Sequence, residues 1–511
     1  MPIINISETQ LRRTAAILGT DIPFIPGFAK SVANGAAYET PILCQSVREF
    51  EKYFGLEPVE FKVANTNLKI EIGDYDKSYI MAKELLNLGM PVYYYAVDGN
   101  AAATGKEEVD VLAGFTFGDD VYIPGTELTV RDGDVTIKCD ITANSGETIK
   151  WDTLKDFDLT YADGSLNIKA KEGVTVKYPT TLTLRAYVER DVDVFGQFYI
   201  TLKTYFTNKD LEDKNEYTVK YITTGGYPNF GSATEAYNIY QSMIDVAKSR
   251  GDAIALVEAP NDFDRALTGN GSFFESLKAA TITDPSYAAA FTPWAEYSLI
   301  KKYDELAKAI MPACFGYLAD LALNIKTSPN WLAMAGTTRG LVPNILKLNT
   351  KARLSNVIAH EYQPTTDNND TSNTYRALNA ITDVKPYGYT IWGNRTLEPV
   401  KEELMPLNML NTRNMVSDIK KVAYKAAKAQ MFEQNTEALW LNFKSEVSPY
   451  LDKLKSGNGI SDYKLIKTDY KADGSDLKRH EFACAITIYP LYAVEAFDIN
   501  VMISGDDVAV D

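Results

Sequence analysis

The stretch YGYTIWGNRTL at residues 387–397 opens the part of the chain that decides the fold. Its first half is rich in aromatic and β-branched residues and begins after Pro386, which is typical of a strand. Two helices are predicted next, from about Thr412 to Phe432 and from Thr436 to Leu454, and strand-like segments follow them. This order predicts a mixed domain of strands and long helices at residues 386–504.

Earlier parts of the chain alternate helices with buried strands. A helical face at residues 81–88 ends before Gly89 and precedes the apolar run PVYYYAV. A second helical face at residues 239–246 precedes DAIALVEAP in the same way. We therefore predict a middle α/β domain formed by residues 23–108 and 223–385.

Between these two parts, residues 109–222 have the composition of an all-β domain. The segments VTIKCDI, SLNIKAK, VTVKY, LTLRAYV and FYITLKTYF read as strands, and Asp132-Gly133 and Asp163-Gly164 supply turns. We expect no helix of three turns in this region. The fold class is therefore a multidomain α+β and α/β protein with an inserted all-β domain.

Composition limits the classes of function. The net charge of −16 disfavours general nucleic-acid binding, which needs a basic surface to replace phosphate counterions. No apolar run is long enough for a membrane span, and the first residues lack the order of a signal peptide, so we expect a soluble cytosolic product. The four cysteines are widely spaced and predict reduced thiols rather than disulfides or a zinc site: Cys44, Cys139, Cys314 and Cys484.

A search for catalytic motifs finds no converging set of residues. The two histidines, His360 and His480, are too few for a His-rich metal site, and HEY at His360 lacks the second His of a zinc protease motif. LTGNGS lacks the Lys-Ser/Thr of a phosphate-binding loop, and DNNDTSN lacks the Gly and Glu of an EF-hand. We expect no enzyme, no cofactor and no metal site.

One helix combines a small-residue face with a lysine stripe. Around the predicted 412–432 helix, one side carries Ile419, Val422, Ala423 and Ala426, and the other carries Lys421, Lys425 and Lys428. A solvated surface helix explains most such stripes. In a strongly acidic chain, however, a basic track also suits docking to an acidic partner. The pattern leaves both interpretations open.

A series of motifs then follows one order along the chain: YETPILCQSVREFEKYFG, SYIMAKELLNLGMPVYYYAV, ALVEAPN, SYAAAFTPWAEY and SPNWLAMAGTTRGLVPN. YGYTIWGNRTL and LNTRNMVSDIKKVAYKAAKAQMFEQNTEALW come after them. In this order and spacing the chain resembles the contractile tail sheath proteins of myophages and related contractile injection particles, which carry WGARTL and NVRR…I…A…FEPN…LW. It departs from them at Gln434, where Pro is usual, at residues 411–414, which weaken a double Arg, and at LVPN, where WKAP is usual.

The resemblance implies a structural subunit. Sheath subunits polymerise as stacked six-fold rings around a tail tube and contract to drive the tube through the host envelope for DNA delivery. The implied partners are further copies of the chain, the inner tube protein, and baseplate and tail terminator proteins, with no direct nucleic-acid contact and no membrane insertion. The implied location is the virion tail, after assembly in the host cytoplasm. The core domain would combine residues 1–22 with residues 386–504.

The resemblance also implies strand arms lent to neighbouring subunits. In FDINVMISGDDVAVD, residues 497–503 alternate as a strand of the subunit itself, Gly505 is the predicted hinge, and residues 505–511 form the C-terminal arm. A strand this short is unstable alone but gains hydrogen bonds at an open sheet edge. The predicted arm residues are Ile3, Ile4, Ile6, Val508, Ala509 and Val510.

Within this interpretation the lysine stripe Lys421, Lys425 and Lys428 is predicted to face an acidic tube. The alternative is a phage tail or baseplate adhesin whose receptor-binding domain is the β insertion at residues 109–222. An acidic hydrolase without a recognisable motif is a third interpretation.

Overall fold

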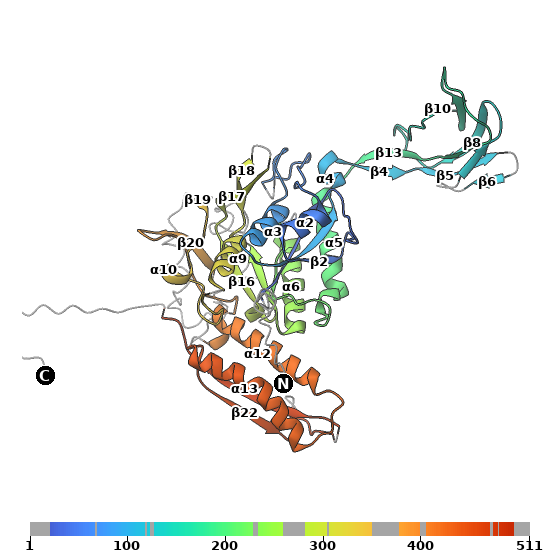
Figure 1. The fold of residues 1–511 in the computed structure, drawn as a ribbon. Helices are drawn as coiled ribbons and strands as arrows, with labels where there is room; N and C mark the ends of the chain where they lie inside the picture. Colours follow the sequence, from blue (N-terminus) through green and yellow to red (C-terminus); the bar gives the residue numbers. More distant parts are fainter. Residues whose placement is uncertain are drawn as a thin grey trace, which may run out of the picture. The chain divides into compact units, whose positions relative to one another are not determined.

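The computed structural model describes residues 21–66, 69–117, 120–122, 127–227, 233–258, 282–303, 306–325, 327–349, 378–398, 405–470, 474–478 and 480–494. The chain forms two compact units (Figure 1). The first unit comprises Met1–Val59, Asn65–Asp98 and Phe195–Asp511, and the second comprises Glu60–Ala64 and Gly99–Val194.

A mixed sheet forms the centre of the first unit. Among the described residues it has eight strands in the order β2-β3-β1-β14-β15-β16-β20-β21. The inner strands are parallel, whereas the edge strands β2 and β21 are antiparallel to their neighbours. The bounds are β1 Pro23–Ala29, β2 Pro41–Cys44, β3 Val92–Asp98, β14 Tyr221–Ile222, β15 Ile254–Glu258, β16 Ala288–Thr292, β20 Leu378–Val384 and β21 Gly388–Trp392.

Helices cover both faces of this sheet, as the alternation of β1 shows. Ile25 and Ala29 belong to the apolar core that also contains α3 (Lys77–Asn87), α9 (Ala313–Asn324) and α2 (Val47–Phe54). Phe24 and Phe28 point to the opposite face and pack on the aromatic side chains of α5 (Val194–Asn208). A parallel sheet covered on both faces needs apolar strands throughout, and all seven residues of β1 are buried.

The α/β elements predicted from periodicity are confirmed. The predicted helix at residues 81–88 is α3, which Asp76 caps by accepting a hydrogen bond from Ser78 N at Oδ1 (3.1 Å). The second predicted helix is α6 (Ala233–Arg250), which precedes β15. Smaller elements complete this part: β17 Ala295–Tyr303, β18 Leu306–Met311, β19 Ile345–Leu348, α10 Gly336–Arg339, and the 3₁₀ turns η1 Asp210–Glu212, η2 Pro285–Tyr287 and η3 Pro406–Asn408.

The last described part of the first unit contains two long helices and a two-stranded sheet. Helix α12 spans Leu410–Ala429 and α13 spans Glu437–Ser456, close to the predicted limits, and the Thr436 side chain caps α13 by accepting a hydrogen bond from Leu439 N. Strands β22 (Ile460–Thr468) and β23 (Ala483–Pro490) pair antiparallel. Both helices and both strands share one apolar core around Trp440, Phe443 and Val447.

The second unit is built mainly from short antiparallel strands. Its described sheets have the orders β10-β11-β8-β5-β6, β12-β7 and β4-β13-β9. The predicted turn at Asp163-Gly164 is confirmed, because both residues have positive φ and join β10 to β11. The bounds are α4 Asn100–Thr104, β4 Lys106–Asp110, β5 Leu112–Phe117, β6 Asp120–Tyr122, β7 Glu127–Val130, β8 Val135–Ile141, β9 Lys150–Trp151, β10 Phe157–Ala162, β11 Ser165–Ala170, β12 Thr180–Thr183 and β13 Ala186–Asp191.

The prediction that FYITLKTYF forms a strand was wrong, and so was the expectation of no three-turn helix in residues 109–222. The segment lies in α5. Its aromatic and β-branched residues favour a strand locally, but the buried positions recur with helical spacing, at Phe195, Phe198, Leu202, Tyr205 and Phe206. Burial of this stripe against the sheet overrides the local preference. VTVKY is not a strand either.

Candidate functional site

The sheet β22-β23 has only two strands among the described residues. The two strands pair from Ile460 with Pro490 to Thr468 with Ala483. In the part of the chain that the structure describes, no third strand joins either of them. A strand with an unpaired edge presents a row of N–H and C=O groups that can pair with another segment. This sheet is therefore the candidate site for strand addition.

Exposed apolar side chains lie on both strands of this sheet and just beyond β23. Ile466 on β22 is 52% exposed, and Val494, beyond β23, is 69% exposed. Tyr489, Leu491 and Tyr492 are also exposed. Exposed apolar side chains that lie together mark interaction surfaces, so these residues are candidates for one.

An apolar groove lies between α12 and β23. Its volume is about 380 Å³. Ile486, Ile488 and Pro490 line it from the strand, and Val416, Ile419 and Ala423 line it from the helix. Of the small-residue face predicted for this helix, Ile419 and Ala423 line the groove, while Ile419 and Ala426 are also buried in the core around Trp440. A groove beside a free strand edge can accept alternate side chains of an added strand.

The opening stretch of the sequence connects the central sheet to α12. Asn379 on β20 donates from Nδ2 to Arg395 O (2.8 Å) and accepts at Oδ1 from Arg395 N (2.7 Å). Asn394 then donates from Nδ2 to Asn411 Oδ1 (2.7 Å) in the first turn of α12. A Cβ on Gly393 would lie 2.9 Å from Asn379 Cα, so only glycine fits there without a shift. The motif WGNRT therefore has a structural role in placing the helix.

A buried charge cluster makes a second connection between α12 and the rest of the unit. Lys220 is fully buried, and its Nζ lies 2.6 Å from Asp418 Oδ1 on α12 and 2.9 Å from Asp21 Oδ1. Asn330 donates from Nδ2 to both carboxylates at 2.9 Å. These residues are far apart in the sequence, and no local pattern predicts their meeting.

The two carboxylates keep Lys220 charged although it is buried. Burial disfavours the ammonium form, but the negative charges of Asp21 and Asp418 outweigh it and raise the pKa of Lys220 above its usual value. Lys421 lies near the same cluster, and burial together with the charge of Lys220 lowers its pKa to about 8. Helix α12 is thus held to the rest of the unit by buried ion pairs, and removing one partner would leave an unpaired buried charge.

The predicted lysine stripe is only partly an exposed surface. Lys425 and Lys428 are exposed, and Lys428 Nζ donates to Asn215 Oδ1 (2.6 Å). Lys421 is half-buried beside the charge cluster, so it does not share the exposed stripe. Helical spacing places the three lysines on one side of α12, but other segments of the same chain partly cover Lys421.

The predicted arm residues lie outside the described residues. These are Ile3, Ile4 and Ile6 at one end and Gly505, Val508, Ala509 and Val510 at the other. The strand predicted at residues 497–503 and the segment around His360 also fall outside them. Their assignments stay predictions.

Buried acids of the central sheet are enclosed by hydrogen bonds. Burial raises the pKa of Asp76 to about 6, although Tyr227, Phe28 N, Ser78 N and Tyr94 all donate to its carboxylate. Glu258 accepts from Thr224 Oγ1 (2.6 Å), Gly226 N (2.9 Å) and Cys314 Sγ. Both acids hold loops at the sheet together.

Within the described ranges, no group of three or more His, Cys, Asp or Glu side chains is arranged to hold a metal ion. None of the described helices combines the length and the apolar character that a membrane crossing requires.

Comparison with known proteins finds relatives of this chain among phage proteins. It is 24% identical over 270 residues to the tail sheath protein of Vibrio phage KVP40, across 52% of this chain and 36% of that protein. The chain is homologous to phage tail sheath proteins. It is also 23% identical over 285 residues to the tail sheath protein of Enterobacteria phage T4, across 53% of this chain and 40% of that protein. The match thus spans less than half the length of either relative, and no protein-family model matches the chain.

Solved structures of contractile injection systems share the fold of this sheath homologue. A chain of the sheath complex of an extracellular contractile injection system, in the contracted state, has a TM-score of 0.50 at 14% identity, with 99% of this chain and 98% of that chain covered. A chain of the anti-feeding prophage baseplate in the contracted state has a TM-score of 0.53 at 15% identity, with 99% of both chains covered. These similarities confirm a multidomain fold of helices and several sheets.

Proposed function

We propose that the chain is a structural subunit of a contractile tail sheath, with no catalytic role. It would polymerise as stacked six-fold rings around an inner tube and contract to drive that tube through a host envelope. Homology to tail sheath proteins and the shared fold support this proposal. Its further partners would be the tube protein, the baseplate and the tail terminator. Its core domain would combine residues 1–22 with residues 386–504, leaving the β insertion outside the core.

The observation that carries the proposal is the sheet β22-β23, which has no third strand among the described residues and lies beside an apolar groove. Arm strands of neighbouring copies, at residues 3–6 and 508–510, would add to its edges, with Gly505 as the hinge. Each backbone hydrogen bond of an added strand contributes roughly 1 kcal/mol, and apolar arm side chains would fill the groove. Several such links per subunit would keep a lattice connected while its packing changes.

Replacing Ile488 with aspartate tests the groove. Ile488 lines it, whereas the neighbouring Thr487 is exposed on the same strand, so Thr487→Asp is a matched control. Losing one buried isoleucine contact and placing a charge there should weaken each subunit contact by at least about 2 kcal/mol, or roughly 30-fold. Sedimentation and electron microscopy of the full chain would measure the assembly.

We expect hollow six-fold tubes from the unaltered chain and from Thr487→Asp, and folded, unassembled subunits from Ile488→Asp. Deleting residues 506–511 should have the same effect as Ile488→Asp. Normal tubes from both altered chains would refute the arm-docking role. Isolated trimers of the unaltered chain would instead favour the adhesin.

A further inference from the structure

An acidic pocket lies where the loop after α5 meets the start of β2, and no residue of the sheet β22-β23 is among its described lining residues. Its volume is about 380 Å³, within the range of small-ligand sites. Four exposed carboxylates form its rim: Glu39, Asp210, Asp213 and Glu216. Two buried tyrosines, Tyr205 and Tyr217, line it together with Pro41. The pocket thus combines a negative rim with aromatic walls.

Tyr205 supplies an independent sign of a missing ligand. Its side chain is only 5% exposed, and its Oη has no hydrogen-bond partner among the described residues. Its ring packs on Tyr95 (4.5 Å between centroids) and on Phe24 (5.6 Å). A buried hydroxyl without a partner is costly, and such a group at a pocket wall is satisfied when a ligand donates to it.

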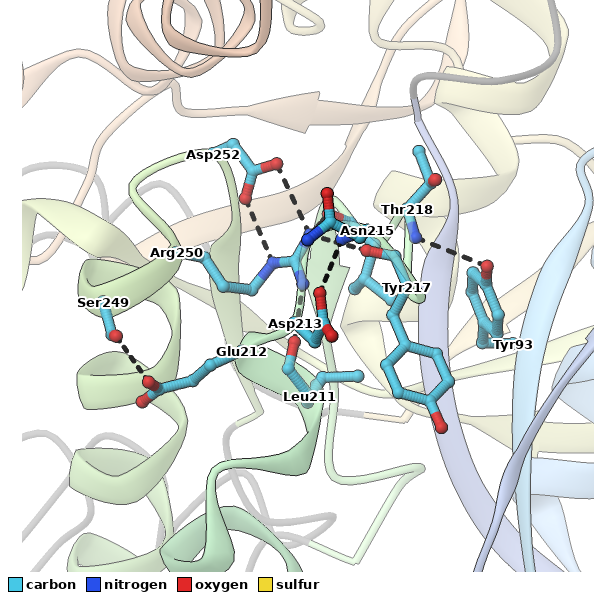
Figure 2. Close-up of polar contacts among 11 residues, drawn as sticks. Tyr93, Leu211, Glu212, Asp213, Asn215, Tyr217, Thr218, Ser249, Arg250 and Asp252 are labelled. Atoms are coloured by element: carbon cyan, nitrogen blue, oxygen red, sulfur yellow. Dashed lines mark hydrogen bonds and ion pairs between the residues drawn. The ribbon is translucent and has the colours of Figure 1, made fainter. Parts of the chain in front are cut away.

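Hydrogen bonds from Arg250 fix the backbone of the loop that carries three of the carboxylates. Figure 2 shows the guanidinium of Arg250 between Asp252 and this loop; it is buried and donates to Leu211 O (2.5 Å) and Tyr217 O (2.8 Å). Asp252 Oδ1 accepts from Arg250 Nε (3.0 Å) and balances its charge. Thr218 N also donates to Tyr93 Oη (3.3 Å). A preorganised rim loses little conformational entropy when a ligand binds.

The chemistry of the lining selects the ligand. Within the described residues the carboxylates are not arranged as a metal-binding group, which disfavours a divalent ion. Lys209 is the one basic residue among the described lining residues. Its Nζ lies 3.9 Å from Oε1 of Glu212, a residue that does not line the pocket. An organic cation satisfies the carboxylates with its charge, the tyrosine rings by cation–π contact and the Tyr205 hydroxyl with an N–H donor.

We propose that this pocket binds an ammonium or guanidinium group on an aliphatic stem. Such a group is carried by a diffusible polyamine and also by a Lys or Arg side chain of a second copy of the chain. The inference does not rest on the sheath proposal, because binding is measured on the unassembled full-length chain.

Calorimetric titration with spermidine and with N-acetyl-arginine amide tests the site, and N-acetyl-glutamine amide serves as the neutral probe. Asp210→Asn with Glu216→Gln removes two rim charges and keeps their shape. Asp158→Asn with Glu172→Gln removes two exposed charges from the second unit as the matched control. We expect the rim variant to weaken binding of both cations about tenfold and the control to leave it unchanged.

Tyr205→Phe separates ligand contact from a structural role. Because the hydroxyl has no partner in the described structure, the variant should keep the unfolding stability of the unaltered chain while cation binding weakens by at least threefold. Unchanged binding in Tyr205→Phe, equal binding in the rim variant and its control, or binding of the neutral probe as tight as that of the cations would overturn the proposal.

The source of the cation is decided by assembly. If a side chain of a second copy fills the pocket, the rim variant should assemble less well than its control, and spermidine should inhibit assembly of the unaltered chain. If both measurements show no change while spermidine still binds the unassembled chain, the ligand is the diffusible cation. Either result supports the site.

Discussion

Replacing Lys220 with methionine tests the charge cluster that attaches α12. Lys220 is 0% exposed and lies 2.6 Å from Asp418 and 2.9 Å from Asp21. Methionine has a similar length and volume, so the change leaves two buried carboxylates without their counter-ion. Breaking a buried ion pair costs about 3–5 kcal/mol, and the nearby Lys421 supplies part of the missing charge. We therefore expect the free energy of unfolding to fall by about 3 kcal/mol at pH 7.

Urea unfolding followed by tryptophan fluorescence measures this change, because Trp331 and Trp440 lie in the core shared with α12. The triple variant with Asp21→Asn and Asp418→Asn should recover most of the loss, since no charge is then buried unpaired. In Lys220→Met, the buried carboxyls have raised pKa values, so they bind protons before the unfolded chain does. The destabilisation should therefore shrink as the pH falls from 7 towards 4. A loss below about 1 kcal/mol, or a triple variant no more stable than Lys220→Met, would refute the reasoning.

Two further predictions concern a buried acid and the exposed lysines. Burial raises the pKa of Asp320 to about 8, so the folded chain holds a proton that the unfolded chain releases above its usual pKa of 3.8. Stability should therefore fall between pH 4 and 8 by roughly 1 kcal/mol per pH unit from this group; Asp320→Asn should remove that slope in urea unfolding, and an unchanged slope would contradict the assignment. If Lys425 and Lys428 face the tube, reversing both to Glu should weaken cosedimentation with tubes about tenfold at low salt and less at high salt. Tube binding equal to that of the unaltered chain would refute this role and leave the interpretation of these lysines as a solvated surface.

Local patterns predicted most of the elements around the site. Helices α12 and α13 begin and end close to their predicted limits because their apolar positions repeat with helical spacing and Thr436 is a good cap. The hairpin at Asp163-Gly164 formed as predicted because the turn requires positive φ at both positions. The segment FYITLKTYF was assigned wrongly because its composition favours a strand, while its burial against Phe24 and Phe28 requires a helix.

The candidate site was less predictable than its elements. The lysine stripe follows from helical spacing, yet the pKa of Lys421 is lowered by its burial and by the charge of Lys220, which lies on a distant segment. The hydroxyl of Tyr205 has no hydrogen-bond partner among the described residues, and the pocket that it lines forms only where the segments around Glu39 and Glu216 meet. No local signal could have found either feature.

By itself, the sequence determined the order of helices and strands, the acidic composition and the resemblance to sheath proteins, because periodicity, turn residues and motif order are local properties. Only the tertiary structure decided which described strands pair with one another, which charges are buried together and where carboxylates gather around a tyrosine. Those features depend on contacts between segments that lie hundreds of positions apart, such as Lys220 with Asp418 and Asn330 with Asp21. Burial and pairing across such distances follow from packing, which no single segment encodes.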